Sequence, residues 1–317
     1  MSMKRRRMLL LLGTGLGAAV TGGAIAQFTK SQSQGRSELP TDAKSPDSTY
    51  AQQPAQAESK ASKTPLLRFA AIADTGTGDS GQYAVADAMA KYYEQKAYPL
   101  VILAGDNIYP DGEIKLVKSV FEEPYKPLLS QGVEFRAVLG NHDIITDNGV
   151  PQIEYAPFHM PDRYYTFRQG SVQFFGIDTN VNSPWKKQLA WLEQNLAASD
   201  AAWKIVFGHH PIYSSGFYGN TQAFIDDLSP LFAKYNVQLY LCGHDHDYER
   251  SKDIQGTTYI VHGGGAHPRP VGKQATTAYA IAKRSFVVLE IYDREILTEA
   301  VDTDGKVFDR GKIALKS

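Results

Sequence analysis

The chain has 317 residues, of which 43% are hydrophobic and 21% are charged, so it is long enough for one large domain or two small ones. Its formal net charge is −1 at pH 7, and no overall basic field favours nucleic acid or a membrane surface as a partner. The single cysteine, Cys242, excludes an intramolecular disulfide and a zinc–thiolate site. Because it ends an apolar run, it is expected to be a buried small hydrophobe.

The N-terminus has the pattern of an export signal. The basic segment Lys4–Arg7 precedes an apolar stretch that ends in Ala24–Ala26, and this order is typical of a secretory signal peptide. Residues 1–26 are therefore predicted to be a signal peptide, and Arg6-Arg7 also resembles a twin-arginine export motif. The protein is expected to be periplasmic or secreted. The alternative is an uncleaved membrane anchor, because the apolar stretch could nearly span a bilayer.

The segment after the predicted signal peptide differs in composition from the rest of the chain. Residues 27–64 are rich in Gln, Ser, Ala, Lys and Pro without apolar periodicity, which predicts a disordered linker. From Leu66 onward, strands and helices alternate. A helix is expected to begin after its cap, Asp79, and to run through Lys96. Strands are predicted over 66–73, 100–104 and 133–139, and a hairpin over 164–167 and 172–177.

The remaining elements divide into a mixed part and a part made of strands alone. The mixed part is predicted to begin with a helix over 184–198, with Ser183 and Pro184 as its cap and first-turn pair. A strand, a helix and a strand follow over 203–207, 220–235 and 237–242, and then strands alone over 257–261, 286–291, 296–301 and 307–314. This pattern predicts one domain over 65–317 of the α/β (α+β) class. Its two packed mixed β-sheets are flanked by helices in four layers.

Five short motifs that follow predicted strands carry side chains able to bind metals. They are Asp74–Gly76, Gly105–Tyr109, Gly140–Asp143, Val206–His209 and Gly243–His246. In open α/β sheets, ligands bind beyond the carboxyl ends of the strands, so these motifs are expected to meet at one rim. Their carboxylate, phenolate, amide and imidazole groups suit two adjacent hard or borderline cations.

Asp106 is expected to be the central residue of this site. A carboxylate just after a strand can give one oxygen to each of two cations and hold them about 3.5–4 Å apart. Asp74 is expected to bind the first metal only, and Asn141 the second through its neutral carbonyl. Imidazoles come from His209, His244 and His246. Each motif alone is a weak signal, but five in this order are a strong one.

The motifs D-x-G, G-D-x-x-Y, G-N-H-D, V-x-x-H and G-H-x-H resemble those of the purple acid phosphatases, which are calcineurin-like metallophosphoesterases. The compact chain resembles the small, tartrate-resistant type over roughly residues 66–312. The resemblance implies a metallophosphoesterase catalytic domain over 65–317 with Fe(III) and a divalent Fe, Zn or Mn ion. It implies ferric ligands at Asp74, Asp106, Tyr109 and His246, and divalent-site ligands at Asp106, Asn141, His209 and His244.

Tyr109 separates this chain from many other metallophosphoesterases. Those have a D-x-H first motif, in which the histidine binds the first metal, whereas this chain has Gly76 there. A tyrosine instead follows Asp106 by three residues, and phenolate is a hard anionic donor that favours trivalent iron. The alternative is that Tyr109 packs on the rim beside Pro110.

His142 matches the family's histidine that contacts phosphate and assists the leaving group. Asp143 is expected to orient the His142 ring as a hydrogen-bond acceptor. His262 borders three glycines and is a candidate supporting residue beside the metal-binding loops.

The loop after V-x-x-H departs from the family pattern. Many members place a further substrate-side histidine there, but residues 214–220 contain none. His210 is the candidate catalytic replacement, with a structural role beside Pro211 as its alternative. Tyr213 and Tyr218 are the other candidates to contact phosphate.

The resemblance implies an acid phosphatase that hydrolyses small-molecule phosphate monoesters by in-line attack of a metal-bound hydroxide, and the N-terminal signal predicts that it is exported. His142 would protonate the leaving group. One alternative is a phosphodiesterase or nucleotide hydrolase on the same scaffold, and another is a metal-storing or phosphate-binding protein without turnover. A monomer is expected, with no nucleic-acid partner and with membrane attachment only if the N-terminal segment is uncleaved.

Overall fold

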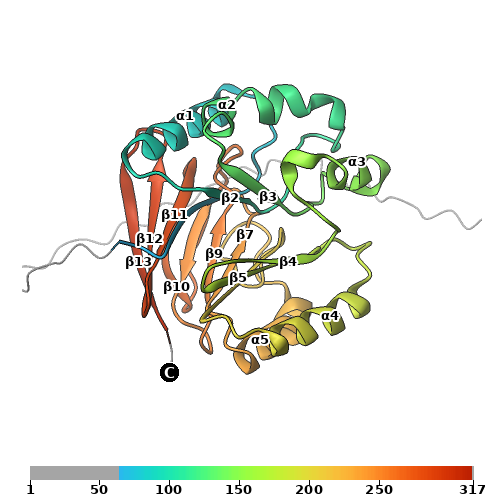
Figure 1. Ribbon diagram of the computed structural model, residues 1–317, viewed down its shortest axis with the longest axis vertical. Coiled ribbons are helices and arrows are strands. Elements are labelled where there is room, and N and C mark those ends of the chain that lie inside the picture. Colours follow the sequence, from blue (N-terminus) through green and yellow to red (C-terminus); the bar gives the residue numbers. More distant parts are fainter. Residues whose placement is uncertain (1–63, 316–317) are drawn as a thin grey trace, which may run out of the picture. The chain divides into compact units, whose positions relative to one another are not determined.

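The structure is a computed structural model, and it describes residues 64–315. Within this range two mixed β-sheets lie against each other, with α1 and α2 over one sheet and α4 and α5 over the other (Figure 1). The strand orders are β13-β12-β11-β1-β2-β3 and β10-β8-β9-β7-β6-β5-β4. The predicted fold class is confirmed. The predicted signal peptide and residues 27–63 of the predicted linker lie outside the described residues.

The first sheet joins a parallel part to an antiparallel part. Its parallel strands are β1 (Leu67–Ile72), β2 (Leu100–Leu103) and β3 (Glu134–Ala137). The antiparallel strands are β11 (Ser285–Ile291), β12 (Glu295–Asp302) and β13 (Val307–Ala314). Helix α1 (Ser80–Gln95) begins after Asp79, whose carboxylate accepts a hydrogen bond from the Gln82 N–H at 2.8 Å. This is the expected N-cap, which satisfies one of the free donors of the first turn.

The second sheet has a parallel centre with antiparallel edges. Strands β5 (Val172–Gly176), β6 (Trp203–Phe207), β7 (Leu239–Cys242) and β9 (Thr258–His262) are parallel. Strands β4 (Tyr165–Gln169), β8 (Tyr248–Ser251) and β10 (Thr277–Ile281) are antiparallel to their neighbours. Helices α4 (Trp185–Ala198) and α5 (Gln222–Lys234) pack their apolar faces against it.

Buried aromatic residues join the two sheets. Phe69 on β1 and Phe174 on β5 are fully buried, and their rings meet edge to face with centroids 5.2 Å apart. Trp203 on β6 is also fully buried, and its indole N–H donates to the Tyr292 carbonyl. Cys242 is buried as predicted. This interior fixes the strand ends, and therefore the loops that carry the predicted site.

Several local predictions need correction. Pro184, not Ser183, occupies the N-cap position of α4, and no side chain caps that helix. The strands β8 and β10 and several short helices were not predicted. The short helices are Ile114–Leu116, Lys118–Glu122, α2 (Lys126–Leu129), Asp147–Gly149, α3 (Val150–Ile153) and Ala156–Phe158. In the described part of the chain, no helix has the length and apolar character needed to span a membrane.

Candidate metal centre

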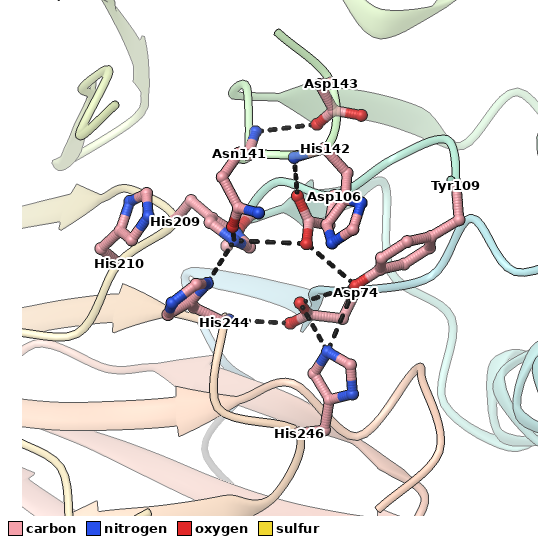
Figure 2. Close-up of polar contacts among 12 residues, drawn as sticks. Asp74, Asp106, Tyr109, Asn141, His142, Asp143, His209, His210, His244 and His246 are labelled. Carbon is pink, nitrogen blue, oxygen red and sulfur yellow. Dashed lines mark hydrogen bonds and ion pairs between the residues drawn. The ribbon is translucent and has the colours of Figure 1, made fainter. Parts of the chain in front are cut away.

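The five motifs meet at one rim of the two sheets, as Figure 2 shows. The loops after β1, β2 and β3 supply Asp74, Asp106 with Tyr109, and Asn141; those after β6 and β7 supply His209, His244 and His246. Three of these residues have left-handed backbone, with φ of 59° at Asp74, 52° at Asp106 and 68° at His244. Such backbone is uncommon outside glycine and often marks functional sites where the surroundings hold the strain.

One group of donor atoms gathers around the Tyr109 hydroxyl. Its Oη lies 3.1 Å from Asp74 Oδ1, 2.9 Å from Asp106 Oδ2 and 3.3 Å from His246 Nε2. His246 Nε2 in turn lies 3.4 Å from Asp74 Oδ1. Burial and the two carboxylates raise the pKa of Tyr109 well above its usual range. A phenolate at this position therefore requires a nearby cation.

A second group gathers around the His209 ring. His209 Nε2 lies 3.1 Å from Asn141 Oδ1, 3.2 Å from His244 Nδ1 and 3.4 Å from Asp106 Oδ2. The same Asp106 oxygen thus belongs to both groups, whereas the sequence predicted one oxygen for each metal. The other oxygen, Oδ1, accepts a hydrogen bond from the His142 N–H at 3.0 Å instead. Burial lowers the pKa of His209, but the carboxylates of Asp106 and Asp74 outweigh that effect and raise it. The net effect of these charges is a site that attracts positive charge.

Backbone carbonyls fix which ring nitrogen of two histidines faces the centre. His209 Nδ1 donates to the Ala104 carbonyl at 3.0 Å, and His246 Nδ1 donates to the His267 carbonyl at 3.3 Å. In the neutral rings, Nε2 therefore carries a lone pair that faces the oxygen and nitrogen atoms of the neighbouring donors. A cation bound between these atoms would stabilise the arrangement. Ligand bonds of about 2.0–2.2 Å place neighbouring donors about 2.9–3.5 Å apart. The spacing of 2.9–3.4 Å seen here fits that requirement.

Gly76 explains how Tyr109 reaches the site. A Cβ atom at position 76 would lie 2.1 Å from the Asn107 carbonyl oxygen, so any larger residue would push the loop after β2 away. Two backbone hydrogen bonds hold the loops after β1 and β2 together: Gly76 N–H donates to the Asp106 carbonyl at 3.3 Å, and Tyr109 N–H donates to the Gly76 carbonyl at 2.9 Å. The glycine that replaces the D-x-H histidine therefore also makes room for the tyrosine.

Asp143 does not orient the His142 ring, so that prediction is wrong. Its buried carboxylate accepts hydrogen bonds from the backbone N–H groups of Asn107 at 2.9 Å, Ile108 at 3.0 Å and Gly140 at 2.8 Å. These bonds tie together the two loops that carry Asp106 and Asn141. Burial and the Asp106 charge raise the pKa of Asp143 to about 6, although the backbone donors oppose the shift.

His142 has a different anchor. Its Nδ1 donates to the Pro110 carbonyl at 2.5 Å, and its backbone N–H donates to Asp106 Oδ1 at 3.0 Å. The ring lies against Tyr109, with centroids 4.5 Å apart. No hydrogen bond to its Nε2 forms within residues 64–315, and the residue is half-buried. One ring nitrogen therefore stays open beside the centre.

Two of the three candidates for the missing loop histidine border the centre. The Tyr218 ring stacks on His244 with centroids 4.1 Å apart and an interplanar angle of 24°. The His210 ring lies 4.4 Å from that of His244, and its Nδ1 accepts from Thr179 Oγ1 at 2.8 Å. Burial, His209 and His244 lower the pKa of His210 to about 2. Tyr213 lies elsewhere, where its hydroxyl accepts from Ser229 on α5.

His262 supports the centre through its backbone. Its carbonyl accepts from the Ala73 N–H at 3.3 Å, and a Cβ on Gly263 would lie 2.7 Å from Asp74 Oδ2. The ring is fully buried without a hydrogen-bond partner, and burial lowers its pKa to about 4.

One residue that the sequence did not single out also borders the site. The Arg269 guanidinium lies over the Tyr218 ring, with Cζ 5.6 Å from the centroid.

A two-sheet sandwich with acidic and imidazole donors at its strand ends is the architecture of a metallophosphoesterase. Residues 67–248 match the family model described as calcineurin-like phosphoesterase, and the chain belongs to this family. One ligand atom from each of Asp74, Asp106 and His209 lies within 4.8 Å of the others, which makes these residues a candidate metal-binding group.

Within that family, the chain is similar to acid phosphatases. It is 29% identical to tartrate-resistant acid phosphatase type 5 of Oryctolagus cuniculus, over 77% of this chain and 89% of the relative. It is 28% identical to purple acid phosphatase 7 of Arabidopsis thaliana, over 79% and 87%. The solved structure of purple acid phosphatase PPD1 from yellow lupin has the same fold, with a TM-score of 0.67 at 21% identity over 78% of this chain and 53% of that one. The predicted resemblance to purple acid phosphatases is confirmed.

Proposed function

We propose that this protein is an exported acid phosphatase that hydrolyses phosphate monoesters of small molecules at a centre of two metal ions. The observation that carries the proposal is the position of Asp106 Oδ2, which lies 2.9 Å from Tyr109 Oη and 3.4 Å from His209 Nε2. A carboxylate shared by two donor groups is the arrangement that holds two cations about 3.5–4 Å apart. The names of the relatives support the same activity.

The donor set suits a pair of unlike ions. Asp74, Asp106, Tyr109 and His246 would hold Fe(III), because carboxylate and phenolate oxygens are hard anionic donors. Asp106, Asn141, His209 and His244 would hold a divalent Fe, Zn or Mn ion, since amide and imidazole groups add no charge. When bound, such ions polarise phosphoryl oxygens and acidify the attacking water.

His142 is placed to act on the leaving group. Because Nδ1 donates to the Pro110 carbonyl, the open nitrogen is Nε2. In the protonated ring, Nε2–H would donate to the departing ester oxygen, which develops negative charge as its bond to phosphorus breaks. The Tyr109 ring packs against the His142 ring, and the Asp106 carboxylate accepts a hydrogen bond from the His142 backbone N–H. These two contacts keep the imidazole in place. The low pKa of His210 keeps its ring neutral, so His210 is better suited to supporting its neighbours than to donating protons.

Rates with two esters test this proposal. We expect the purified protein to hydrolyse p-nitrophenyl phosphate much faster than the corresponding bis-ester, and to lose that activity when a chelator removes the metals. Faster hydrolysis of the bis-ester would instead favour the phosphodiesterase alternative. Absence of turnover in a protein that holds two metals would favour a binding or storage role.

Export is a separate part of the proposal, and it depends on residues outside the described range. If residues 1–26 are a cleaved signal peptide, the exported protein should begin at Gln27. N-terminal sequencing of the protein from the culture medium or periplasm tests this expectation. An intact N-terminus in the membrane fraction would support the uncleaved anchor.

A further inference from the structure

An open cleft adjoins the candidate metal centre on the side of the Tyr109 donor group. It has a volume of about 410 Å³, and its wall includes Thr77, Asp79, Tyr109, His246, His267 and Arg269. Because Tyr109 and His246 belong to both the cleft and the centre, a substrate whose phosphoryl group sits at the centre would extend naturally into this space. Charged groups in the cleft wall would therefore face the part of the substrate that carries the phosphoryl group.

Two arginines near this cleft differ in how their charge is used. Arg284 donates to Asp79 Oδ2 at 2.8 Å and to the Gly265 carbonyl at 2.8 Å, so the carboxylate in the cleft wall is already neutralised. Arg269, by contrast, forms no ion pair with any residue in the range 64–315, and it is half-buried. An arginine without an acidic partner beside a phosphoester site is an available anion-binding group.

Arg269 is nevertheless held in a defined place. Its backbone N–H donates to the His246 carbonyl at 2.8 Å. Its guanidinium covers the Tyr218 ring at 5.6 Å, and that ring stacks on His244. The cation–π contact and the backbone bond limit the motion of the side chain without using its hydrogen-bonding fork. The unused N–H groups thus lie one ring away from a candidate metal ligand.

We propose that Arg269 forms an accessory anion site, which binds a second acidic group on the leaving-group part of the substrate. A planar guanidinium binds carboxylate or phosphate oxygens in pairs, so the preferred substrates are phosphomonoesters that carry a further carboxylate or phosphate. This inference rests on the proposed phosphatase function and adds the substrate class to it.

Kinetics with three matched aryl esters test the site. The substrates are phenyl phosphate, 4-carboxyphenyl phosphate and 1,4-phenylene bisphosphate, and the variants are Arg269→Gln and Arg269→Lys. We expect Arg269→Gln to lower kcat/KM for one or both of the doubly acidic esters by about tenfold to a hundredfold, mainly through KM, as for a lost charge-assisted hydrogen bond. The effect on phenyl phosphate should be much smaller. Comparing each variant with the wild type cancels differences in leaving-group acidity.

Arg269→Lys tests the geometry of the charged group, and a substitution of a distant arginine serves as the control. Lysine keeps the charge but not the fork, so its losses should be intermediate. Arg294, also without an ion pair among the described residues, is exposed in the turn between β11 and β12, three residues after Ile291. Ile291 pairs with Leu67 at the start of β1, whereas the centre lies beyond the other end of that strand. Arg294→Gln removes the same charge and should leave all three rates unchanged.

The outcomes separate the two proposals. A loss confined to the carboxylate ester or to the bisphosphate supports the site and identifies the acidic group that it prefers. Equal losses for all three esters, or no loss for any, would overturn the accessory site, because a purely structural Arg269 would not distinguish the substrates. Wild-type protein that, with both metals present, hydrolyses none of the esters would contradict the phosphatase function itself.

Discussion

The two donor groups of the centre share one carboxylate oxygen but differ in charge. The group around Tyr109 combines the carboxylates of Asp74 and Asp106 with a phenol and one imidazole. The group around His209 adds to Asp106 only neutral donors, which are Asn141 and His244. Since trivalent ions favour hard anionic oxygen donors, this difference in charge is what would separate the proposed Fe(III) from the proposed divalent ion.

The largest expected effect comes from removing the shared group. Asp106→Ala takes an oxygen from both donor groups at once, so metal content should fall below one ion per chain. Activity should fall by roughly four orders of magnitude or more, because groups that act as a unit lose their effect together. Metal analysis and p-nitrophenyl phosphate turnover measure the two losses. Asp111→Ala, an exposed change in the same loop, should cause neither, and retention of both metals by Asp106→Ala would refute the shared-ligand role.

His142 tests whether chemistry separates from metal binding. His142→Ala should keep both metals and lower kcat by roughly 10²–10⁴, the usual effect of one acid–base group. The loss should shrink for esters with good leaving groups, because those need less protonation. The neighbouring change Asn141→Ala should instead lower metal content and activity together. The role assigned to His142 is wrong if His142→Ala loses metal or slows all esters equally.

Asp143 tests whether the two groups depend on the loops beneath them. Asp143→Ala leaves the buried N–H groups of Asn107, Ile108 and Gly140 without their acceptor, at about 1–3 kcal/mol for each unsatisfied group. The free energy of unfolding should therefore fall by at least about 3 kcal/mol, and activity by roughly tenfold to a hundredfold, as for supporting groups at metal sites. Denaturant unfolding of the metal-free protein checks the first expectation. Unchanged stability would mean that water or another acceptor replaces the carboxylate.

The smallest effect is expected from removing the residues before the sheets. A chain that begins at Thr64 keeps all of β1 and should retain its specific activity within about twofold, since the predicted linker lacks the apolar residues needed to join a core. A chain that begins at Phe69 loses Leu67, which pairs with Ile291, and should be markedly less stable. Loss of folding in the first of these chains would show that the preceding segment packs against the domain.

Local patterns predicted the strand ends well and the longer-range contacts less well. Apolar runs followed by Asp, Asn or His mark β1, β2, β3, β6 and β7, and the donor residues after them meet as expected. Strand β8 escaped prediction because the polar residues Glu249 and Arg250 interrupt it. Strand β10 (Thr277–Ile281) has no polar–apolar alternation, since four of its five residues are apolar, and it is only partly buried.

The errors at the site have a common origin. Asp143 was assigned to its sequence neighbour His142, but its partners belong mostly to the loop after β2, more than thirty residues earlier. Arg269 lies between two prolines in a segment without a recognised motif, and only the fold brings it over Tyr218. Sequence separation hides such contacts, whereas the residue types that bind metals are visible from the chain itself.

The proposed centre of Fe(III) and a divalent ion is tested most directly by comparing the wild type with Tyr109→Phe. The two measurements are the metal content and the visible spectrum of each protein. We predict two metals per wild-type chain, one of them iron, and a visible band from charge transfer between phenolate and Fe(III). Tyr109→Phe removes only the hydroxyl, so the chain should stay folded and the band should disappear. An unaltered band, or a wild-type protein that binds two identical divalent ions and no iron, would contradict an Fe(III) site with Tyr109 as its ligand.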